Sequence, residues 1–549
     1  MRRDCDRFAH LDGTFNAPEC RPGSRRPYRA LTWTRVYVLL GVSDLRHSLG
    51  VRATAVERCS VTVRGDGTCK RWVQLQCRTS DSVPLSRRRV QPSGQSFQSD
   101  RSVQMFDVIV VGAGFAGLTA ARVGAGFAGL TAARELGTAG LKVLVLEARD
   151  RIGGRTWTGE FAGQTLELGG MYVHWFQPHV YAEMTRYGVD YVTPPEPSRW
   201  SYKAEGQMHH GEPGEVLKRI CEVSRRFTPD PIDVFPQPFK PLCAADALGK
   251  VDDLTLQDQL DRSGLSAEDQ DLISAILGTM ATGPLDRTAL TCWQRWLALS
   301  GNDLEGAFEA TGTHRFETGL LAQAIADASS AEFRFDSPVA SVVNTSHGVQ
   351  VSTRNGDAFS ARAAVVAVPV NTLSEIKFTP ALPASRSSAI SRGAGGVGGK
   401  FWVHVRGPLD VFYLTQPSGE AVTFLDTQYV LDNNEQILVA FTQAPSFDFN
   451  DVDAVRAIVQ PLLPEGVEVL AAKGHDWVRD EFAQGSWSVY QPGQLTEDHT
   501  ILQSEHHNVF FAGADIADGW NGFIDGAIES GTKTARTVSA HLHTDSKGS

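Results

Sequence analysis

Three glycines that follow a short apolar segment are well placed in this sequence to bind a phosphate group. Residues 106–111 are rich in β-branched side chains, as in a buried parallel strand, and Gly112, Gly114 and Gly117 follow with the spacing G-x-G-x-x-G. The first glycine permits a tight turn, the second lets the backbone approach a pyrophosphate, and the third lets a helix pack on the strand. Free N–H groups at the start of that helix favour negative charge. The motif predicts a dinucleotide site.

Charged residues after the next apolar segment indicate how long the bound dinucleotide is. Residues 142–146 predict a second strand, and Glu147 ends it, where a carboxylate can accept hydrogen bonds from both hydroxyls of an adenosine ribose. The chain continues as ARDRIGGRT, with Arg155 directly after two glycines. An arginine there can lie against the pyrophosphate, and the glycines let a long cofactor pass close to the backbone. A nicotinamide dinucleotide does not need this extension, whereas FAD, whose flavin reaches further, does.

The phosphate loop occurs twice, because residues 111–122 (VGAGFAGLTAAR) recur unchanged as residues 123–134. The first copy follows the strand directly, but Gly112 lies 35 residues before Glu147, whereas Gly124 of the second copy has the usual distance of 23. Use of the first copy lengthens the helix by about 3.3 turns and puts glycines inside it. Use of the second copy separates strand and turn by a 12-residue insertion. We expect the first copy to bind the pyrophosphate.

Length and composition indicate a large globular protein with two or three domains. The chain has 549 residues, of which 42% are hydrophobic and 21% charged. Its net charge of −11 argues against a general nucleic-acid binder. Residues 1–104 hold 19 Lys and Arg against 9 Asp and Glu, so we expect a poorly structured basic extension there, with a targeting arm as the alternative and Met105 as the natural start.

Cysteines and apolar runs bear on location. Three cysteines follow residue 104 at spacings that fit no zinc site and suggest no disulfide framework, and no apolar run reaches the length of a membrane span. We expect a cytoplasmic protein without a metal.

Nucleotide-type segments occur at the start, middle and end of the remaining chain. The fold class is therefore α/β, with a Rossmann-type, glutathione-reductase-like FAD-binding domain (residues 105–181, 305–372 and 481–545) interleaved with an α+β substrate domain (residues 182–304 and 373–480).

Four separated blocks resemble the flavin-containing monoamine oxidase family over about residues 106–541. They are residues 106–157, 167–174, 365–383 and 510–531, in the order the family has them. Within the family, the segment GGMYVHWFQPHVYAEMTRYG is most similar to bacterial 6-hydroxynicotine and pseudooxynicotine oxidases.

This resemblance assigns cofactor contacts along the chain. Glu147 would bind the ribose, and Arg149 and Arg155 would lie along the adenosine and pyrophosphate. The remaining cofactor contacts would be Gly170 and Met171 beside the flavin ring, Val339 at the adenine, Asp515 near the ribityl-pyrophosphate, and the backbone N–H of Ile524 at the flavin pyrimidine. His174 and Trp175, which follow the double glycine, are candidates to face the pocket.

The resemblance also assigns the substrate end of the site. Lys400, in GGKFW, matches a lysine that holds a water at flavin N5, where a cation would stabilise negative charge developing on oxygen. Trp487 and Phe523 match two aromatics that flank the substrate amine and can hold a cation. The ordinary alternatives are an exposed lysine and aromatic core packing. Ser486 stands where mitochondrial members have a cysteine joined to the flavin, so we expect non-covalent FAD.

The resemblance implies an enzyme that oxidises a primary or secondary amine to an imine and then an aldehyde or ketone, with O2 reduced to H2O2. The expected partners are a small-molecule amine and O2, with a homodimer as the oligomeric state considered and neither nucleic acid nor membrane. Two alternatives stay open at this point. One is a dehydrogenase or desaturase that uses another electron acceptor, and the other is an FAD-binding scaffold impaired by its duplicated loop.

Overall fold

Two units make up the chain, residues 1–100 and 101–549, and each is described by itself. The computed structural model describes residues 59–65, 71–77, 105–112, 126–228, 230–302, 304–312, 314–444 and 447–548. In the smaller unit, β1 (Cys59–Gly65) pairs antiparallel with β2 (Arg71–Cys77), with Val63 opposite Val73. These two strands are the described part of the segment predicted to be a poorly structured basic extension (residues 1–104), and that prediction stays open. Their polar and apolar residues alternate, which favours strand pairing.

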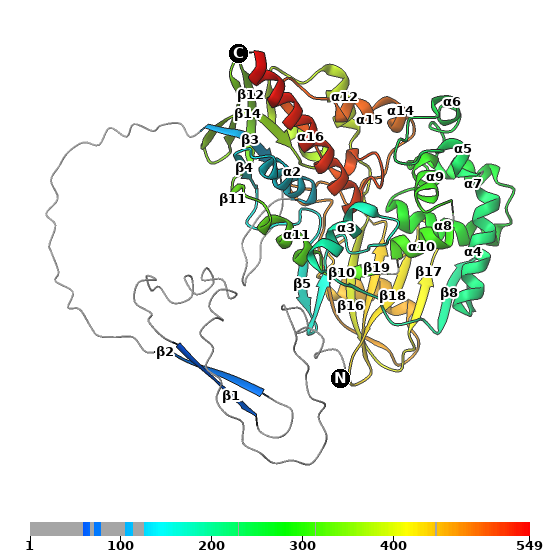
Figure 1. Ribbon diagram of the computed structural model, residues 1–549. Coiled ribbons are helices and arrows are strands. Elements are labelled where there is room, and N and C mark those ends of the chain that lie inside the picture. The colour runs from blue at the N-terminus through cyan, green and yellow to red at the C-terminus, as the bar shows by residue number, and fades with distance from the viewer. Residues whose placement is uncertain are drawn as a thin grey trace, which may run out of the picture. The chain divides into compact units, whose positions relative to one another are not determined.

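An eight-stranded sheet with a parallel centre forms one half of the larger unit (Figure 1). Val110 of its central strand lies beside Val145 on one side and Val365 on the other. In order across the sheet, the strands are β11 (Glu332–Arg334), β4 (Val143–Leu146), β3 (Met105–Val111), β14 (Ala358–Val366), β13 (Gly348–Thr353), β12 (Val339–Thr345) and β15 (Lys377–Thr379), with β21 (Val509–Phe511) paired to β14.

Both faces of this sheet are covered, which explains its continuous apolar strands. Val108 and Val110 pack into one hydrophobic cluster, whereas Ile109 and Val111 pack into another on the opposite face. The helices on the first face are α2 (Phe127–Thr138), α3 (Pro178–Tyr187), α11 (Thr318–Asp327) and α16 (Ile524–Gly548), which pack on one another. The second cluster includes residues of η3 (Val370–Glu375), α12 (Ala384–Arg392) and α15 (His499–Gln503).

A seven-stranded, mainly antiparallel sheet forms the other half of the larger unit. Its strands, in order, are β20 (Glu468–Gly474), β16 (Gly399–Arg406), β19 (Glu435–Thr442), β18 (Phe424–Val430), β17 (Phe412–Thr415), β8 (Arg199–Ala204) and β9 (Gln207–Gly211). α13 (Val452–Val459) packs on β20. Two short pairs, β5 (Thr158–Phe161) with β6 (Gln164–Glu167) and β7 (Tyr191–Val192) with β10 (Arg315–Phe316), complete the strands of this unit.

Helices beside this second sheet share a large hydrophobic core in which Trp200, Phe227 and Trp293 are almost fully buried. Figure 1 shows these helices on the side of the second sheet where β17 and β8 lie. They are α4 (Pro213–Phe227), α5 (Pro231–Val234), α6 (Ala245–Leu248), α7 (Leu256–Arg262), α8 (Ala267–Ala281), α9 (Leu290–Leu299) and α10 (Leu304–Gly312). The short α14 (Gln494–Glu497) and η5 (Ala514–Ile516) lie near the C-terminal helix in sequence.

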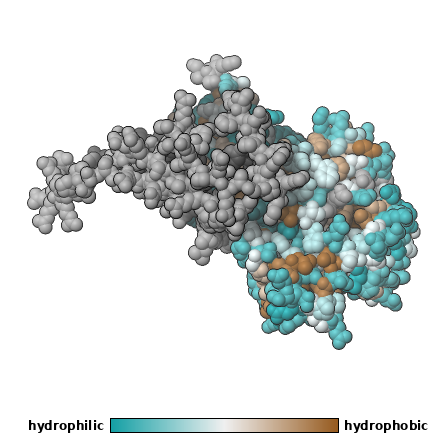
Figure 2. Space-filling model, turned by 60° about the horizontal axis from the view of Figure 1, so that its bottom comes forward, coloured by the Kyte–Doolittle hydropathy of each residue, from teal (hydrophilic) through white to brown (hydrophobic). Residues whose placement is uncertain are grey.

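The two sheets take their strands alternately from the chain. The seven-stranded sheet uses residues from 199–211 and 399–474, while β15 lies just beyond the boundary expected at residue 372. Where the surface is coloured in Figure 2, most of it is hydrophilic, and apolar side chains form a strip and smaller patches. Among the described residues, no helix combines the length and apolar character that crossing a bilayer requires.

Candidate cofactor and substrate site

One cavity of the larger unit is lined by segments from both sheets and from the helices beside them. Its walls include the end of β3, the start of α2, the turn at residues 153–156, the double glycine 169–170 and the start of β16. Residues of α8 and α9 and the segment 477–487 also contribute to the walls. The dinucleotide motif and the expected substrate residues therefore face one space.

The end of β3 and the start of α2 form the part of this wall that suits a phosphate. Gly112 has φ +131°, and a Cβ there would lie 2.8 Å from the carbonyl carbon of Ala367, so glycine is required. α2 begins at Phe127, and its N-cap Gly126 offers no side chain to the first-turn N–H groups. These groups are therefore open to an anion. A Cβ on Gly154 would lie 3.2 Å from the Gly126 Cα, so glycine at both positions permits this close approach.

The helix beside this turn belongs to the second copy of the repeat. We expected the first copy, with Gly112, Gly114 and Gly117, to supply the loop and to open the helix. Gly112 lies on the cavity wall, Gly114 and Gly117 lie outside the described residues, and α2 starts at Phe127. The described helix thus starts in the second copy, and the binding of the pyrophosphate by the first copy stays a prediction. A 12-residue helix from the second copy reaches the turn before β4, whereas a start in the first copy would place glycines in the helix interior.

Glu147, at the end of β4, holds a buried carboxyl oxygen without a hydrogen-bond partner among the described residues. Oε1 accepts a hydrogen bond from the Arg149 backbone N–H at 2.8 Å, while Oε2 is unpaired. Burial raises the pKa of Glu147 well above its usual range. Two hydroxyl donors from a ribose would satisfy Oε2 and oppose that rise. Glu147 is not itself on the cavity wall, although its neighbours Leu146 and Ala148 are.

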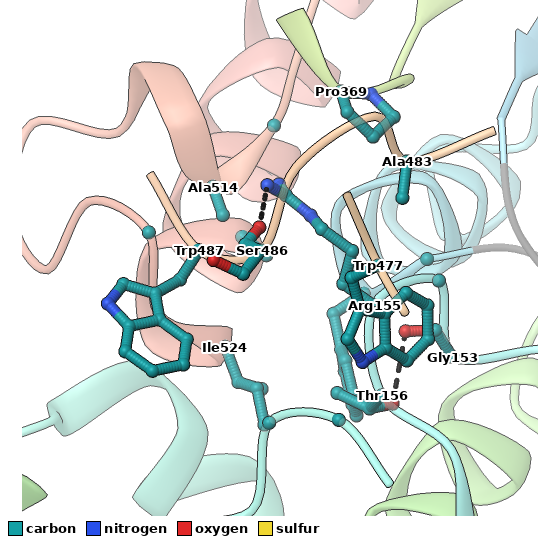
Figure 3. A pocket seen from close by; sticks show the side chains of 18 of the residues that line it. Gly153, Arg155, Thr156, Pro369, Trp477, Ala483, Ser486, Trp487, Ala514 and Ile524 are labelled. Atoms are coloured by element: carbon teal, nitrogen blue, oxygen red, sulfur yellow. Dashed lines mark hydrogen bonds between the residues drawn. The ribbon is translucent and has the colours of Figure 1, made fainter. Parts of the chain in front are cut away.

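Two arginines extend the site from this carboxylate. Arg149 lines the cavity, pairs with Asp480 and lies 5.0 Å from the ring centroid of Phe482, and burial lowers its pKa to about 10. Arg155 also lines the cavity. Its guanidinium group donates to the Ser486 carbonyl oxygen at 2.9 Å (Figure 3) and to Asp515 Oδ1 at 2.5 Å. Asp515 lies behind the wall and is reached through Arg155. A carboxylate therefore holds each guanidinium group in a fixed position on the wall.

Small and apolar residues line the passage beyond the arginines. Gly170 donates its N–H to the Arg155 carbonyl oxygen at 3.1 Å, and a Cβ on Gly170 would lie 3.7 Å from the Ile524 side chain. Met171, Val339 and Ile524 are on the cavity wall. Figure 3 shows the Ile524 side chain between Trp487 and Thr156. The passage can take a flat ring system.

Lys400 lies at the start of β16 with its ammonium group in the protein interior. Its Nζ has no hydrogen-bond partner in the described part of the chain and lies 5.4 Å from the ring centroid of Trp402. Burial lowers the pKa of Lys400 to about 7, and Glu167 opposes that shift. The alternative interpretation, a solvent-exposed lysine, is wrong because Lys400 is only 6% exposed. Such an ammonium is free to interact with a molecule in the cavity.

Trp487 and Phe523 line the same cavity from two different segments. Trp487 Nε1 donates to the Met280 carbonyl oxygen at 2.8 Å, and its ring lies edge-on to Phe441 at 6.1 Å. The Phe523 ring lies edge-on to Trp296 at 5.7 Å. Each ring therefore packs edge-on against another aromatic ring of the same wall.

Several cavity residues had no recognisable signal in the sequence. They come from α8, α9, α10 and the two strands β18 and β19, in which Phe424 faces Phe441 across the ladder. These residues are Ile276, Thr279, Met280, Trp296, Phe308, Phe424 and Phe441. Apolar runs in a fully buried helix or strand do not reveal which face borders a cavity, so only the three-dimensional arrangement identifies them.

His174 and Trp175, two candidates from the sequence, do not contribute to the wall. The His174 ring is buried, lies 3.6 Å from the Trp175 ring centroid and accepts a hydrogen bond from the Phe176 N–H, and burial lowers its pKa to about 4. Trp175 is exposed. Ser486 does line the cavity, with its hydroxyl 3.3 Å from that of Thr282. Within the described residues, no group of His, Cys, Asp and Glu is arranged to hold a metal ion.

A parallel sheet, a glycine turn, an unsatisfied carboxylate and a passage for a long cofactor together define an FAD-dependent oxidoreductase. Residues 127–539 match the model of the flavin containing amine oxidoreductases, and the chain belongs to that family. The predicted family, the α/β fold class, the assignment as an enzyme and the FAD cofactor are confirmed.

Individual relatives are similar over most of their length. Pseudooxynicotine dehydrogenase of a Pseudomonas species is 35% identical over 447 residues, which are 80% of this chain and 87% of the relative. (S)-6-hydroxynicotine oxidase of Paenarthrobacter nicotinovorans is 31% identical, over 80% of this chain and all of the relative. The structure of cyclohexylamine oxidase from Brevibacterium oxydans superposes with a TM-score of 0.63 at 22% identity, over 80% of this chain and all of that chain, and so shows the shared fold.

Proposed function

We propose that this protein oxidises a primary or secondary amine to an imine, which water converts to an aldehyde or ketone, with O2 as the electron acceptor and H2O2 as its product. The observation that carries this proposal is the arrangement of Lys400, Trp487 and Phe523 on the cavity that also holds the dinucleotide turn. A buried ammonium and two aromatic walls at the flavin end suit an amine and a developing negative charge on oxygen.

Five groups from this chain would hold the cofactor. The first-turn N–H groups of α2 and the Arg155 guanidinium would bind the pyrophosphate, Glu147 the ribose, Arg149 the adenosine side, and Val339 the adenine. Ser486 has no sulfur with which to form a thioether, which supports a non-covalent cofactor. FAD, when bound, supplies the acceptor for a hydride equivalent from the carbon next to nitrogen.

The walls of the substrate end favour an apolar or aromatic monoamine. Around Trp487 and Phe523 the lining is apolar, with Ile276, Met280 and Trp296 among its members. Among the cavity-lining residues the carboxylates are Glu375 and Glu481, and both interact with Arg354. Neither is therefore a free partner for a second ammonium group of a diamine. The names of the relatives refer to derivatives of nicotine, which agrees with an alkyl amine that carries an aromatic ring as the substrate.

The aromatic walls would bind the amine and orient its α-carbon, while loss of a proton from the amine precedes oxidation. Because the wall carboxylates Glu375 and Glu481 are paired with Arg354, and Lys400 would act as a cation, the reactive amine would arrive neutral, and amine oxidation would rise with pH. A permanently neutral substrate analogue should show a flat profile. The same rise with that analogue would contradict this account of the proton.

The decisive experiment mixes the yellow, FAD-loaded protein with a panel of aryl-alkyl monoamines without oxygen and follows flavin absorbance. Bleaching by an amine, followed by rapid recovery and one H2O2 per turnover when O2 is added, is the expected result. Putrescine serves as the matched diamine control and should bleach far more slowly. Protein that stays yellow with every amine would refute the proposal.

A second candidate, an amine dehydrogenase with another electron acceptor, is favoured by the name of the Pseudomonas relative, a pseudooxynicotine dehydrogenase. Recovery of absorbance that is slow in air but fast with an added one-electron acceptor would select it.

We also propose a cytoplasmic location, which three free cysteines in the described residues support. A homodimer stays a prediction for sedimentation analysis.

A further inference from the structure

Glu167 is a buried carboxylate for which the proposed reaction has no role. It ends β6, is 4% exposed, and accepts hydrogen bonds on both oxygens. Oε1 receives the Thr158 hydroxyl at 2.5 Å and the Thr318 N–H at 2.9 Å, and Oε2 receives the Thr318 hydroxyl at 2.6 Å. Burial raises the pKa of Glu167, and these three donors oppose that rise because they stabilise the carboxylate.

Trp402 contacts both the backbone of Glu167 and the ammonium group of Lys400. Lys400 and Trp402 stand two residues apart on β16 and so point to the same face of the sheet. Trp402 Nε1 donates to the Glu167 carbonyl oxygen at 2.8 Å, and Lys400 Nζ lies 5.4 Å from the centre of the Trp402 ring. Glu167 and Lys400 are therefore neighbours in the interior, in a setting where charges interact strongly.

Few other charges act on this pair. Within the described part of the chain, Glu167 is the carboxylate that attracts the Lys400 ammonium, and Arg315 of β10 opposes it. Arg151 and Tyr429 also interact with Glu167. Lys400 lines the cavity, and its buried Nζ has no hydrogen-bond partner among the described residues, so the attraction does not tie its N–H groups to a protein acceptor.

We infer that Glu167 is a positioning residue that keeps Lys400 in its cationic form at the cavity wall, an inference that rests on the proposed role of Lys400. A buried ammonium without a counter-charge gives up its proton instead of paying the cost of desolvation. A carboxylate fixed by two threonines supplies that counter-charge at a constant position. It does so without an ion pair that would block the ammonium.

The competing account of Glu167 is purely structural, because the Thr318 N–H that it accepts lies at the start of α11. A carboxylate there stabilises the helix end whatever its effect on Lys400. Glu167→Gln removes the charge but keeps an acceptor oxygen for the helix. Thr318→Ala does the reverse, since it removes one hydroxyl donor at the start of α11 and leaves the carboxylate in place with the Thr158 hydroxyl and the backbone N–H of residue 318 as donors.

The test measures the Lys400 pKa directly in FAD-loaded protein, from the pH dependence of its Cε resonance in ¹³C-lysine-labelled samples, assigned with Lys400→Met. Wild type should titrate near the pKa of about 7. Glu167→Gln should lower that pKa by about one unit. Glu160→Gln, on the neighbouring β5, is the matched control and should leave it unchanged. At pH 7 the cationic fraction, and with it the rate of flavin reoxidation by O2, should then fall about fivefold in Glu167→Gln.

Thr318→Ala should lower the thermal midpoint but move the Lys400 pKa by less than about 0.3 units. An unchanged pKa in Glu167→Gln, or equal shifts in Glu167→Gln and Thr318→Ala, would overturn the inference. If Glu167→Gln does not fold, Glu167→Asp carries the test: its displaced charge should give a smaller shift in the same direction, and no shift overturns the inference. A protein that bleaches with no amine would defeat the proposed function, while the titration would still decide the role of Glu167.

Discussion

Removal of residues 123–134, the second copy of the repeat, should raise the stability of this protein and its FAD occupancy. The two copies are identical, so deletion of either one produces the same chain, in which a single G-x-G-x-x-G follows β3 and leads straight into the helix. Arg122 then takes the place of Arg134, whose guanidinium forms a buried ion pair with Glu183 at 2.5 Å. The deletion therefore keeps the contacts of α2 while it shortens the connection from Gly112 to the helix N-cap.

The size of the effect follows from chain length. Thirteen residues separate Gly112 from Gly126, and one residue would separate the equivalent glycines after the deletion. The entropy of closing a connection grows as about (3/2)RT ln n, so the shorter one stabilises the folded state by about 2 kcal/mol. For a body of this size the unfolding entropy at the midpoint is about 0.9 kcal/mol/K, so the thermal midpoint should rise by about 2 °C. FAD occupancy after purification should equal or exceed that of the full chain.

Differential scanning calorimetry and the ratio of flavin to protein absorbance measure both effects. Deletion of residues 123–133 alone is the matched control, because Arg134 then follows Arg122 and the remaining helix turns by about 100°. That rotation moves Leu136 out of the core, so the control should lose stability and flavin. Loss of flavin or a lower midpoint in the 12-residue deletion would refute the reasoning, since it would show that both copies are needed.

Three further predictions concern single side chains. Lys400→Met should slow flavin reoxidation by O2 about 100-fold and leave anaerobic reduction by amine within about threefold, measured by stopped-flow absorbance. Trp487→Leu, which loses the aromatic wall and the hydrogen bond to Met280, should lower kcat/KM for an aryl-alkyl amine about tenfold, whereas an unchanged value would place the ring in the core alone. Burial raises the pKa of Asp525 from 3.8 to about 7, so the folded state binds its proton more tightly, and the stability this contributes at acid pH is lost as pH rises through about 7. Asp525→Asn should therefore flatten the decline in unfolding free energy between pH 4 and about 7, and an unaltered slope would argue against it.

The resemblance to the flavin-containing monoamine oxidases was enough to name residues that lie far apart in the chain but line the same cavity. Arg155, Lys400, Trp487 and Phe523 are all on the wall, although hundreds of residues separate the first from the last. Each belongs to a segment with an unusual local composition, such as a glycine pair or an aromatic residue beside a turn. A stable core does not require such a composition. Such segments mark the places where backbone must approach a ligand, so they remain recognisable without knowledge of the fold.

The opposite wall of the cavity could not be found in the same way. Trp296 stands in the sequence LTCWQRWLAL, where every residue of α9 is buried, so no amphipathic pattern separates the cavity face from the core face. Phe424 and Phe441 belong to strands buried on both sides, and their pairing across β18 and β19 depends on a register that neither segment reveals alone. Glu167 is a similar case, since its partners Thr158 and Thr318 come from two other elements.

The duplicated loop shows why a motif can be recognised locally and yet be placed only by the fold. From the sequence, the question was which copy binds, because each one is complete. In the described structure the strand end is fixed by its ladders with β4 and β14, which hold Gly112 against Ala367. The helix is fixed separately by its packing on α16, which holds Gly126 against Gly154. Each half of the site is thus selected by its own tertiary contacts, so the cavity takes its first glycine from one copy and its helix from the other.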